Sequence, residues 1–192
     1  MHPLTELSQK IGRTDRSGLP VYGKAKLSPH WYTEYYGPLL EPLRPCLKQF
    51  LEIGIGQGGG ALLWKHYFPE AEIHAVDTLF REEVEKLLKG EGIHTYYDNA
   101  YCETFIRERL EGRRFQVIID DGAHTLESWV FVLNHYVELL DEGGVLVIED
   151  IQTRGQAEEI IRHFRGDRRR LSLVDRRLLE DSAINEMLLV YS

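Results

Sequence analysis

Short apolar runs alternate with helical stretches along the chain from residue 50 onward. The apolar runs predict seven strands, at residues 49–53, 72–76, 92–96, 115–119, 144–149, 170–175 and 186–191. Between them, the spacing of apolar residues predicts helices at about 58–68, 80–89, 100–111, 125–140 and 155–165. This alternation is typical of a parallel sheet with helices on both faces.

The last two predicted strands are separated by about ten residues, most of them polar. That connection is too short for a crossover helix, so the two strands should pair antiparallel as a terminal hairpin. Five strand–helix units followed by a hairpin is the order of the seven-stranded, Rossmann-like sheet of class I methyltransferases. A dehydrogenase domain would instead continue with parallel strands and helices. The pattern therefore predicts an α/β fold of the methyltransferase type.

Residues 1–49 differ from the rest in being rich in Gly, Pro and Tyr, with helical candidates at 4–10 and 31–44. We expect residues 1–49 to form a short N-terminal extension or lid, and residues 50–192 to form the methyltransferase domain. The aromatic side chains of this segment fit either a lid over a ligand or packing against the domain; they are Trp31, Tyr32, Tyr35 and Tyr36.

Composition narrows the class of protein. The 192 residues are 43% hydrophobic and 28% charged, which is typical of a globular protein. The net charge of −8 argues against binding nucleic acid through bulk charge, and residues 50–153 alone hold 20 acidic against 8 basic residues. An arginine-rich stretch at 162–177 keeps a less favoured RNA-binding alternative open.

No apolar run reaches membrane-spanning length and the first residues lack a signal-peptide pattern, so we expect a cytoplasmic protein without membrane contact. Assembly into a homo-oligomer stays open.

A glycine-rich loop follows the first strand and opens a helix. It contains Gly54, Gly56 and Gly58. Glycines let a backbone approach a bound nucleotide closely, and Asp77 at the end of the second strand can accept hydrogen bonds from ribose hydroxyls. This pair fits NAD and S-adenosylmethionine alike. Glu52 before the loop is typical of methyltransferases, and Asp98 and Asn99 after the third strand can hold an adenine amino group.

Two acidic segments follow the fourth and fifth strands. The first holds Asp120, Asp121 and His124, and the second holds Glu149 and Asp150. Because parallel strands end at one edge of a sheet, these residues should face the crevice of the glycine loop. Four converging carboxylates need a cation, and oxygen ligands suit Mg²⁺ or Mn²⁺. His124 is placed to act as a general base for a hydroxyl, although capping aspartates and a surface histidine would give the same pattern.

These motifs together resemble a known family. The block LEIGIGQGGGALLWKHYFPEAEIHAVD, then DDGAH and IEDIQT, is similar to the metal-dependent class I S-adenosylmethionine O-methyltransferases that modify sugar hydroxyls of macrolide and related antibiotics. The similarity runs from about Ile11 to Thr153. It implies S-adenosylmethionine and Mg²⁺ as cofactors and a small hydroxylated acceptor, most simply a sugar of a glycosylated natural product.

The resemblance also implies roles for single residues. It implies Mg²⁺ ligation by Asp121, Glu149 and Asp150, and proton removal by His124. It places the methionine part of the cofactor at Glu52 and the glycine loop, the ribose at Asp77 and the amino group at Asp120. Two alternatives stay open: methylation of a catechol-type aromatic diol, and an NAD-dependent oxidoreductase.

Overall fold

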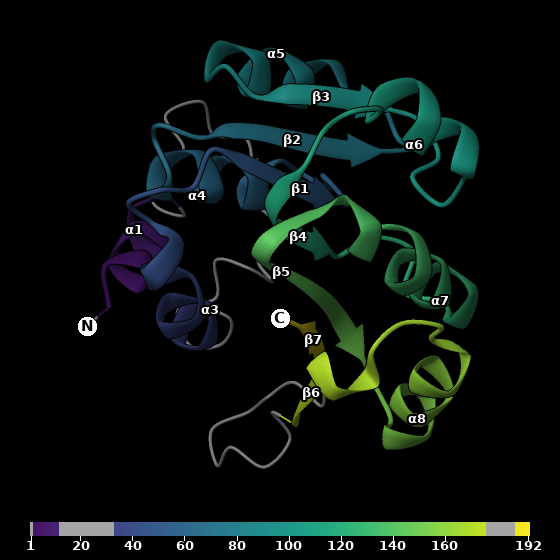
Figure 1. Cartoon of the computed structure of the whole chain (residues 1–192). Helices are drawn as coiled ribbons and strands as arrows, with labels where there is room; N and C mark the ends of the chain where they lie inside the picture. Colours follow the sequence, from purple (N-terminus) through teal and green to yellow (C-terminus); the bar gives the residue numbers. More distant parts are fainter. Residues whose placement is uncertain (1, 12–32, 176–186) are drawn as a thin grey trace. The chain divides into compact units, whose positions relative to one another are not determined.

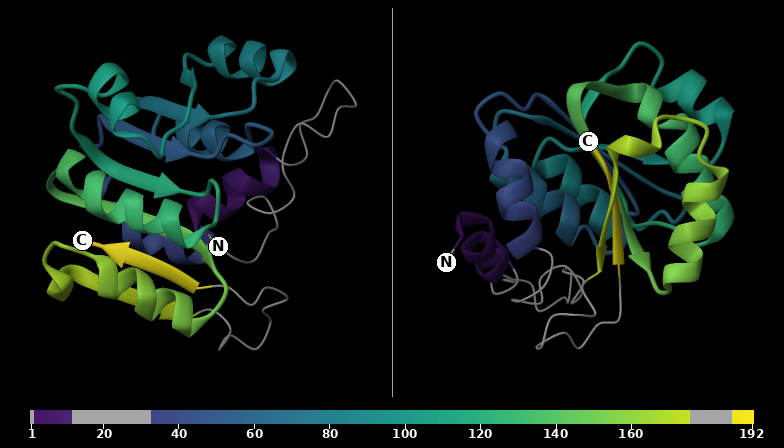
Figure 2. Two further views of the ribbon diagram at one scale, coloured as in Figure 1. Left: turned by 90° about the vertical axis from the view of Figure 1, so that its right-hand side faces the viewer. Right: turned by 60° about the horizontal axis from the view of Figure 1, so that its bottom comes forward.

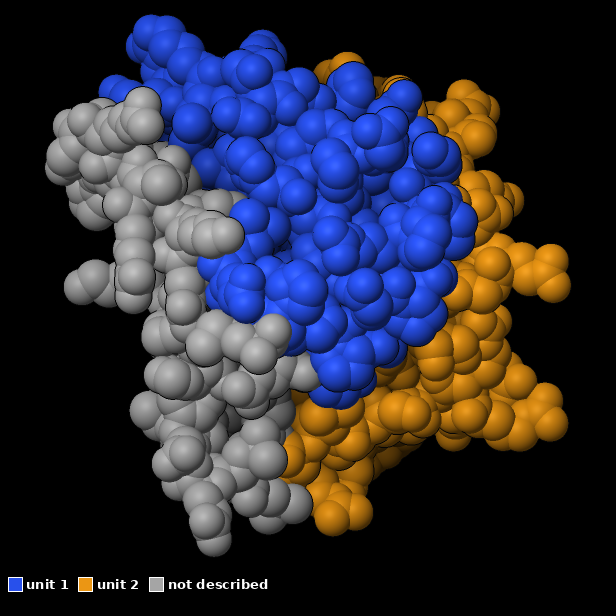
Figure 3. Space-filling view, turned by 90° about the vertical axis from the view of Figure 1, so that its left-hand side faces the viewer, with its two compact units in different colours: residues 1–97 blue, residues 98–192 orange. Residues whose placement is uncertain are grey.

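The computed structural model describes residues 2–11, 33–175 and 187–192. The chain forms two compact units, residues 1–97 and 98–192, which Figure 3 distinguishes by colour. No helix in the described ranges has both the length and the apolar character needed to cross a membrane.

The first unit contains three parallel strands and their connecting helices (Figure 1). Its elements are α1 (Pro3–Ile11), α3 (Thr33–Leu40), the 3₁₀ helix η1 (Glu41–Leu43), β1 (Gln49–Ile53), α4 (Gly59–Tyr67), β2 (Glu72–Asp77), α5 (Glu82–Gly90) and β3 (His94–Tyr97). The register places Gln49 opposite Glu72 and His74 opposite His94. Polar residues therefore stand side by side where these strands begin.

The aromatic core of the first unit explains how its N-terminal helices are held. Trp64 of α4 stacks on Phe50 of β1 with ring centroids 5.1 Å apart, and Tyr36 of α3 meets Trp64 edge-on at 5.2 Å. Tyr36 is only 1% exposed, so it packs in this core rather than over a ligand. The lid prediction for Trp31 and Tyr32 lies outside the described residues.

The second unit contains four strands, of which the last two are antiparallel. Its elements are α6 (Glu103–Arg109), β4 (Phe115–Asp120), α7 (Leu126–His135), η2 (Val137–Leu139), β5 (Leu140–Ile151), α8 (Arg154–His163), η3 (Arg168–Arg170), β6 (Leu171–Asp175) and β7 (Met187–Tyr191). Strand β4 pairs with β5 in parallel, whereas β7 pairs antiparallel with both β5 and β6. Helices α7 and α8 lie on the same side of these strands in both views of Figure 2.

The strand order is β3-β2-β1-β4-β5-β7-β6, in one seven-stranded mixed sheet. The predicted α/β fold with a terminal antiparallel hairpin is thus confirmed. The boundary expected between residues 49 and 50 stays a prediction.

One stretch departs from the sequence-based expectation. The helix expected to run to residue 140 ends at His135, and β5 begins at Leu140 rather than at residue 144. The glycines expected to end the helix instead belong to the strand. A Cβ at Gly144 would lie 3.1 Å from the carbonyl oxygen of Phe115 on β4, so the close pairing of the two strands accounts for a glycine here.

Candidate active site

The loop between β1 and α4 has the backbone expected of a cofactor loop. Gly54, Gly56 and Gly58 have φ values of 96°, 54° and 87°, a region that residues with a Cβ seldom adopt. At Gly58 an added Cβ would also lie 3.2 Å from Val84 and 3.3 Å from Leu88. Substitution at this position would therefore disturb both the loop and its packing on α5.

Asp77 holds this loop in place. Its Oδ2 accepts hydrogen bonds from the backbone N–H groups of Ile55 and Gly56, both at 3.0 Å, and its Oδ1 accepts one from Leu79 at 2.9 Å. A carboxylate offers about four lone-pair directions, so it can accept a hydroxyl as well. Arg81, which sequence reasoning missed, donates to the carbonyl oxygen of Gly56.

Glu52 is buried beneath the same loop, with 1% of its surface exposed. Its Oε1 accepts a hydrogen bond of 3.1 Å from the indole nitrogen of Trp64. The space beside it is closed, because a Cβ at Gly60 would lie 2.2 Å from that oxygen. The carboxylate is therefore fixed between β1 and the first turn of α4.

The connection from β3 to α6 belongs to the second unit. Asp98 and Asn99 are exposed there, and their side chains accept hydrogen bonds from the backbone N–H groups of Asn99 and Tyr101, at 2.7 and 3.0 Å. Both side chains thus shape a tight turn. Their predicted contact with adenine stays a prediction.

Asp120 at the end of β4 is fully buried and accepts a hydrogen bond of 2.8 Å from the hydroxyl of Tyr101 at Oδ1. Among the described residues its Oδ2 has no hydrogen-bond partner. Burial raises the pKa of Asp120 to about 6, although the bond from Tyr101 and the charge of His124 act in the opposite direction. This buried acceptor suits a cationic donor such as an ammonium group.

Asp121, His124 and Asp150 come together at the ends of β4 and β5. Nε2 of His124 lies 3.3 Å from Oδ1 of Asp121 and 3.5 Å from Oδ2 of Asp150. Hydrogen bonding to Asp121 raises the pKa of His124; burial opposes this, and the charges of Asp150 and Asp121 add to the rise. His124 and Asp150 also have positive φ values, 51° and 62°, so strained backbone aims these side chains at one another.

A divalent cation fits the donor atoms of this cluster. One ligand atom from each of the three residues lies within 4.8 Å of the others. Nε2 of His124 lies within 3.5 Å of one oxygen of each aspartate, so both carboxylates face the same point, and carboxylate oxygens are ligands that Mg²⁺ prefers. Glu149 is buried, with 1% exposed, and does not belong to this group within the described residues.

Capping boxes set the lengths of the two acidic loops. Oγ1 of Thr125 accepts a hydrogen bond of 3.1 Å from the backbone N–H of Ser128. Oγ1 of Thr153 accepts one of 3.2 Å from the backbone N–H of Gln156. Each threonine begins its helix soon after a strand end, α7 after β4 and α8 after β5. Asp121, His124 and Asp150 are therefore held in short loops between fixed elements.

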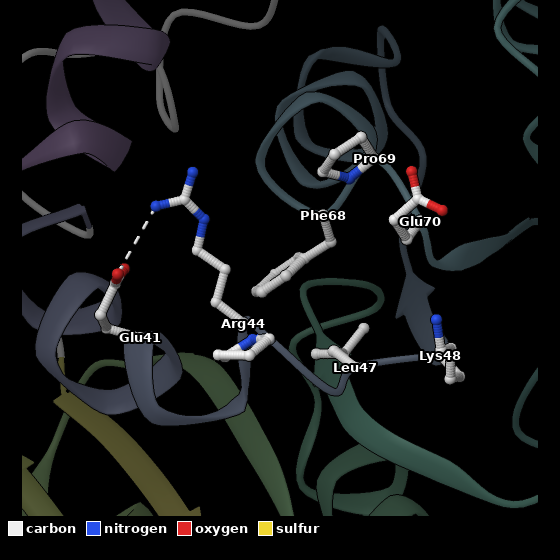
Figure 4. Close-up of a pocket in the computed structure, with 8 residues that line it drawn as sticks. Glu41, Arg44, Leu47, Lys48, Phe68, Pro69 and Glu70 are labelled. Carbon is white, nitrogen blue, oxygen red and sulfur yellow. Dashed lines mark hydrogen bonds and ion pairs between the residues drawn. The ribbon is translucent and has the colours of Figure 1, made fainter.

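A separate pocket of about 440 Å³ lies at the amino end of β1 (Figure 4). Figure 4 shows the ion pair of Glu41 and Arg44, 3.5 Å long, on one side and Lys48 and Glu70 on the other. Since Lys48 directly precedes β1, this pocket lies at the opposite end of the strand from the glycine loop.

Known proteins resemble this chain over most of its length, although no family model matches it. It is 31% identical to the 8-demethyl-8-(2-methoxy-α-L-rhamnosyl)-tetracenomycin-C 3′-O-methyltransferase of Streptomyces olivaceus, over 65% of this chain and 33% of that protein. It is also 31% identical to the mycinamicin VI 2″-O-methyltransferase of Micromonospora griseorubida, over 65% of this chain and 32% of that one. The chain thus spans about a third of the length of the curated relatives it matches.

A solved structure with the same fold is the MycE methyltransferase of the mycinamycin biosynthetic pathway in complex with Mg, SAH and mycinamycin VI. Its TM-score is 0.62 at 26% identity, with 81% of this chain and 39% of that chain covered.

Proposed function

We propose that this chain, a relative of the sugar O-methyltransferases of antibiotic pathways, transfers a methyl group from S-adenosylmethionine to a hydroxyl of a small molecule. The acceptor is a sugar of a glycosylated natural product, and the reaction needs Mg²⁺. The observation that carries the proposal is the convergence of Asp121, His124 and Asp150 at the ends of two neighbouring strands.

Asp121, Glu149 and Asp150 would hold the divalent cation, as the resemblance implies. When bound, the cation would lower the pKa of the acceptor hydroxyl and the cofactor would supply the methyl group. The imidazole of His124 lies between the two carboxylates of Asp121 and Asp150. The residue proposed as the base therefore lies beside two of the residues that would hold the cation.

His124 would receive the proton of the acceptor hydroxyl at Nε2. Its side chain is 34% exposed, so the proton can then pass to solvent. The strained backbone at His124 and the capped start of α7 hold the ring in one place, which favours proton transfer along a fixed direction.

The other candidate residues would bind S-adenosylmethionine. Glu52 and the glycine loop would hold its methionine part, and Asp77 would bind the ribose in addition to holding the loop. Asp98 and Asn99 would contact the adenine, and Asp120 would receive the amino group at its buried carboxylate. Support comes from the positive φ values of the glycines and from the buried Oδ2 of Asp120.

The test is a methyl-transfer assay on the full chain against glycosylated natural products and catechols, with Mg²⁺ and with EDTA. We expect transfer to a sugar hydroxyl that EDTA abolishes. Transfer to catechols alone would mean that the acceptor is an aromatic diol and not a sugar. Activity that EDTA does not diminish would remove the cation from the mechanism. Binding of NAD in place of S-adenosylmethionine would overturn the proposal as a whole.

The variant His124→Ala tests the proton acceptor. Turnover should nearly vanish while the affinity for S-adenosylmethionine stays at its original value. His66→Ala is the matched control, because His66 is an exposed histidine that lies beside the surface residue Glu91. An equal loss of cofactor affinity in His124→Ala would contradict its role as the base.

A further inference from the structure

A second group of metal-binding side chains lies in the first unit, where its strands begin. Glu72 is the first residue of β2, His94 is the first of β3, and His74 follows Glu72 by two residues on the same face. Asp77 ends β2 five residues beyond Glu72, about 16 Å away at the rise of a strand. The group is therefore distinct from the glycine loop.

His74 anchors this group. It is 0% exposed, and both of its ring nitrogens have partners: Nδ1 lies 3.0 Å from the hydroxyl of Tyr96, and Nε2 lies 3.0 Å from Oε1 of Gln49. The Nε2 atom also lies 3.7 Å from Oε2 of Glu72. The ring is thus fixed with Nε2 bonded to Gln49 and close to the carboxylate of Glu72.

We propose that Glu72, His74 and His94 form a binding site for a divalent transition metal, with Zn²⁺ as the matching ion. One ligand atom from each of them lies within 4.8 Å of the others. Two imidazoles and one carboxylate are a donor set that suits Zn²⁺, whereas the oxygen-rich set of the acidic loops suits Mg²⁺. Glu72 and His94 are exposed, so the ion can enter from solvent and keep water as a further ligand.

Binding requires a change of tautomer at His74. The amide of Gln49 donates to Oε2 of Glu72 at 2.9 Å, which leaves its Oε1 as the acceptor facing His74. Nε2 of His74 therefore carries the proton in the ion-free protein. When the metal binds Nε2, the proton of the ring moves to Nδ1. The N–H group at Nδ1 can then donate a hydrogen bond to the hydroxyl oxygen of Tyr96. A hydrogen bond of this kind on the second nitrogen is the usual support of a metal-binding histidine.

Binding also requires His94 to turn. The rings of His74 and His94 are stacked, with centroids 4.8 Å apart and planes at 16°. Since the lone pair of an imidazole lies in the ring plane, two rings stacked face to face cannot both direct a lone pair at one ion. His94 is exposed, so rotation about its side-chain torsions can turn its ring out of the stack toward solvent.

The bound ion would join the first residues of two neighbouring strands. Strand β3 is at one end of the strand order, and strands at an edge are paired on one side only. A metal bound to the folded state alone raises stability by mass action. We therefore expect Zn²⁺ to raise the unfolding temperature of the chain.

The experiment is a calorimetric Zn²⁺ titration of the full chain carrying Asp150→Asn, which weakens the other converging group. One equivalent of Zn²⁺ should bind, and Glu72→Gln or His94→Ala in this background should lower the affinity by at least about tenfold. Both substitutions are at exposed positions, so folding should persist. Glu70→Gln and His66→Ala are the matched controls and should bind Zn²⁺ as before.

A second readout separates ligation from a general effect on stability. In ¹⁵N spectra of the histidine rings, Zn²⁺ should move the proton of His74 from Nε2 to Nδ1. Unchanged affinity in both Glu72→Gln and His94→Ala, or a His74 ring whose proton stays on Nε2 in the loaded protein, would overturn the proposal. Neither readout depends on methyl transfer, so this proposal can fail while the proposed function stands.

Discussion

The hydroxyl of Tyr101 donates a hydrogen bond of 2.8 Å to the buried carboxylate of Asp120. The same oxygen accepts a bond of 2.8 Å from the backbone N–H of Ala123, the residue before His124. One side chain thus connects the strand end assigned to the cofactor with the loop assigned to proton transfer. We expect its loss to affect both functions.

Tyr101→Phe removes both hydrogen bonds and keeps the ring. A bond to a charged group contributes about 1.5–3 kcal/mol, so we expect S-adenosylmethionine to bind roughly tenfold more weakly and kcat to fall as well. Fluorescence titration and steady-state kinetics measure the two effects. Tyr191→Phe is the control, because that hydroxyl accepts from Arg170 at 3.2 Å on the terminal hairpin. Unchanged cofactor affinity in Tyr101→Phe would contradict the role given to Asp120.

Asp150→Asn tests the cation ligands without disturbing the backbone. Asp150 has a φ of 62°, a conformation that asparagine tolerates better than alanine does. The amide cannot replace the negative charge, so the Mg²⁺ concentration needed for half-maximal methyl transfer should rise by at least about tenfold. The control is Asp141→Asn, an exposed position near the start of β5. An Mg²⁺ dependence equal to that of the original protein would remove Asp150 from the ligand set.

The strands were predictable because their signal is local. Runs such as residues 49–53 and 115–119 are apolar enough to be buried on both faces, and β1 (Gln49–Ile53) and β4 (Phe115–Asp120) begin where those runs begin. The start of β5 was missed because glycine signals a helix end and a closely paired strand alike. Only the contact between Gly144 and the backbone of β4 separates the two.

The site was predictable in its acids but not in their partners. Asp121, His124 and Asp150 follow strands, and the rule that parallel strands end at one edge brings them together. Tyr101 carried no signal, because its bond to Asp120 spans 19 residues and depends on how the β3–α6 turn folds. Asp77 was predicted to bind ribose, yet nothing in the sequence indicated that it also holds the N–H groups of the glycine loop.

Gly60→Ala should disturb Glu52. The new Cβ would lie 2.2 Å from Oε1 of Glu52, which Trp64 holds in a buried position. Forced overlap of this kind should lower the free energy of unfolding by about 1–3 kcal/mol, which urea denaturation measures. The affinity for the cofactor should fall as well. Gly90→Ala is the same change in a helix with open space around it, and it should leave stability nearly unchanged. Equal stability of the two variants would show that Glu52 can move without cost.

Glu85 of α5 should make stability depend on pH. Burial tends to raise its pKa, but hydrogen bonds from Lys89, Thr95 and Tyr97 outweigh this and lower the pKa below the ordinary value. Oε2 of Glu85 lies 2.6 Å from Oγ1 of Thr95 and 2.8 Å from the hydroxyl of Tyr97, and both of these residues belong to β3. Because the pKa is lower in the folded state, this stabilisation is present above the unfolded-state pKa of about 4.3 and is lost as pH falls through the folded-state value.

Glu85→Gln should therefore lower the free energy of unfolding by about 2 kcal/mol at pH 7, measured by urea denaturation. The difference from the original protein should shrink as the pH falls through the folded-state pKa of Glu85, below which its carboxyl is itself protonated. Glu83→Gln, an exposed position on the same helix, should show little effect at either pH. A difference that stays constant between pH 7 and pH 3 would mean that the shape of the side chain, and not its charge, holds α5 to β3.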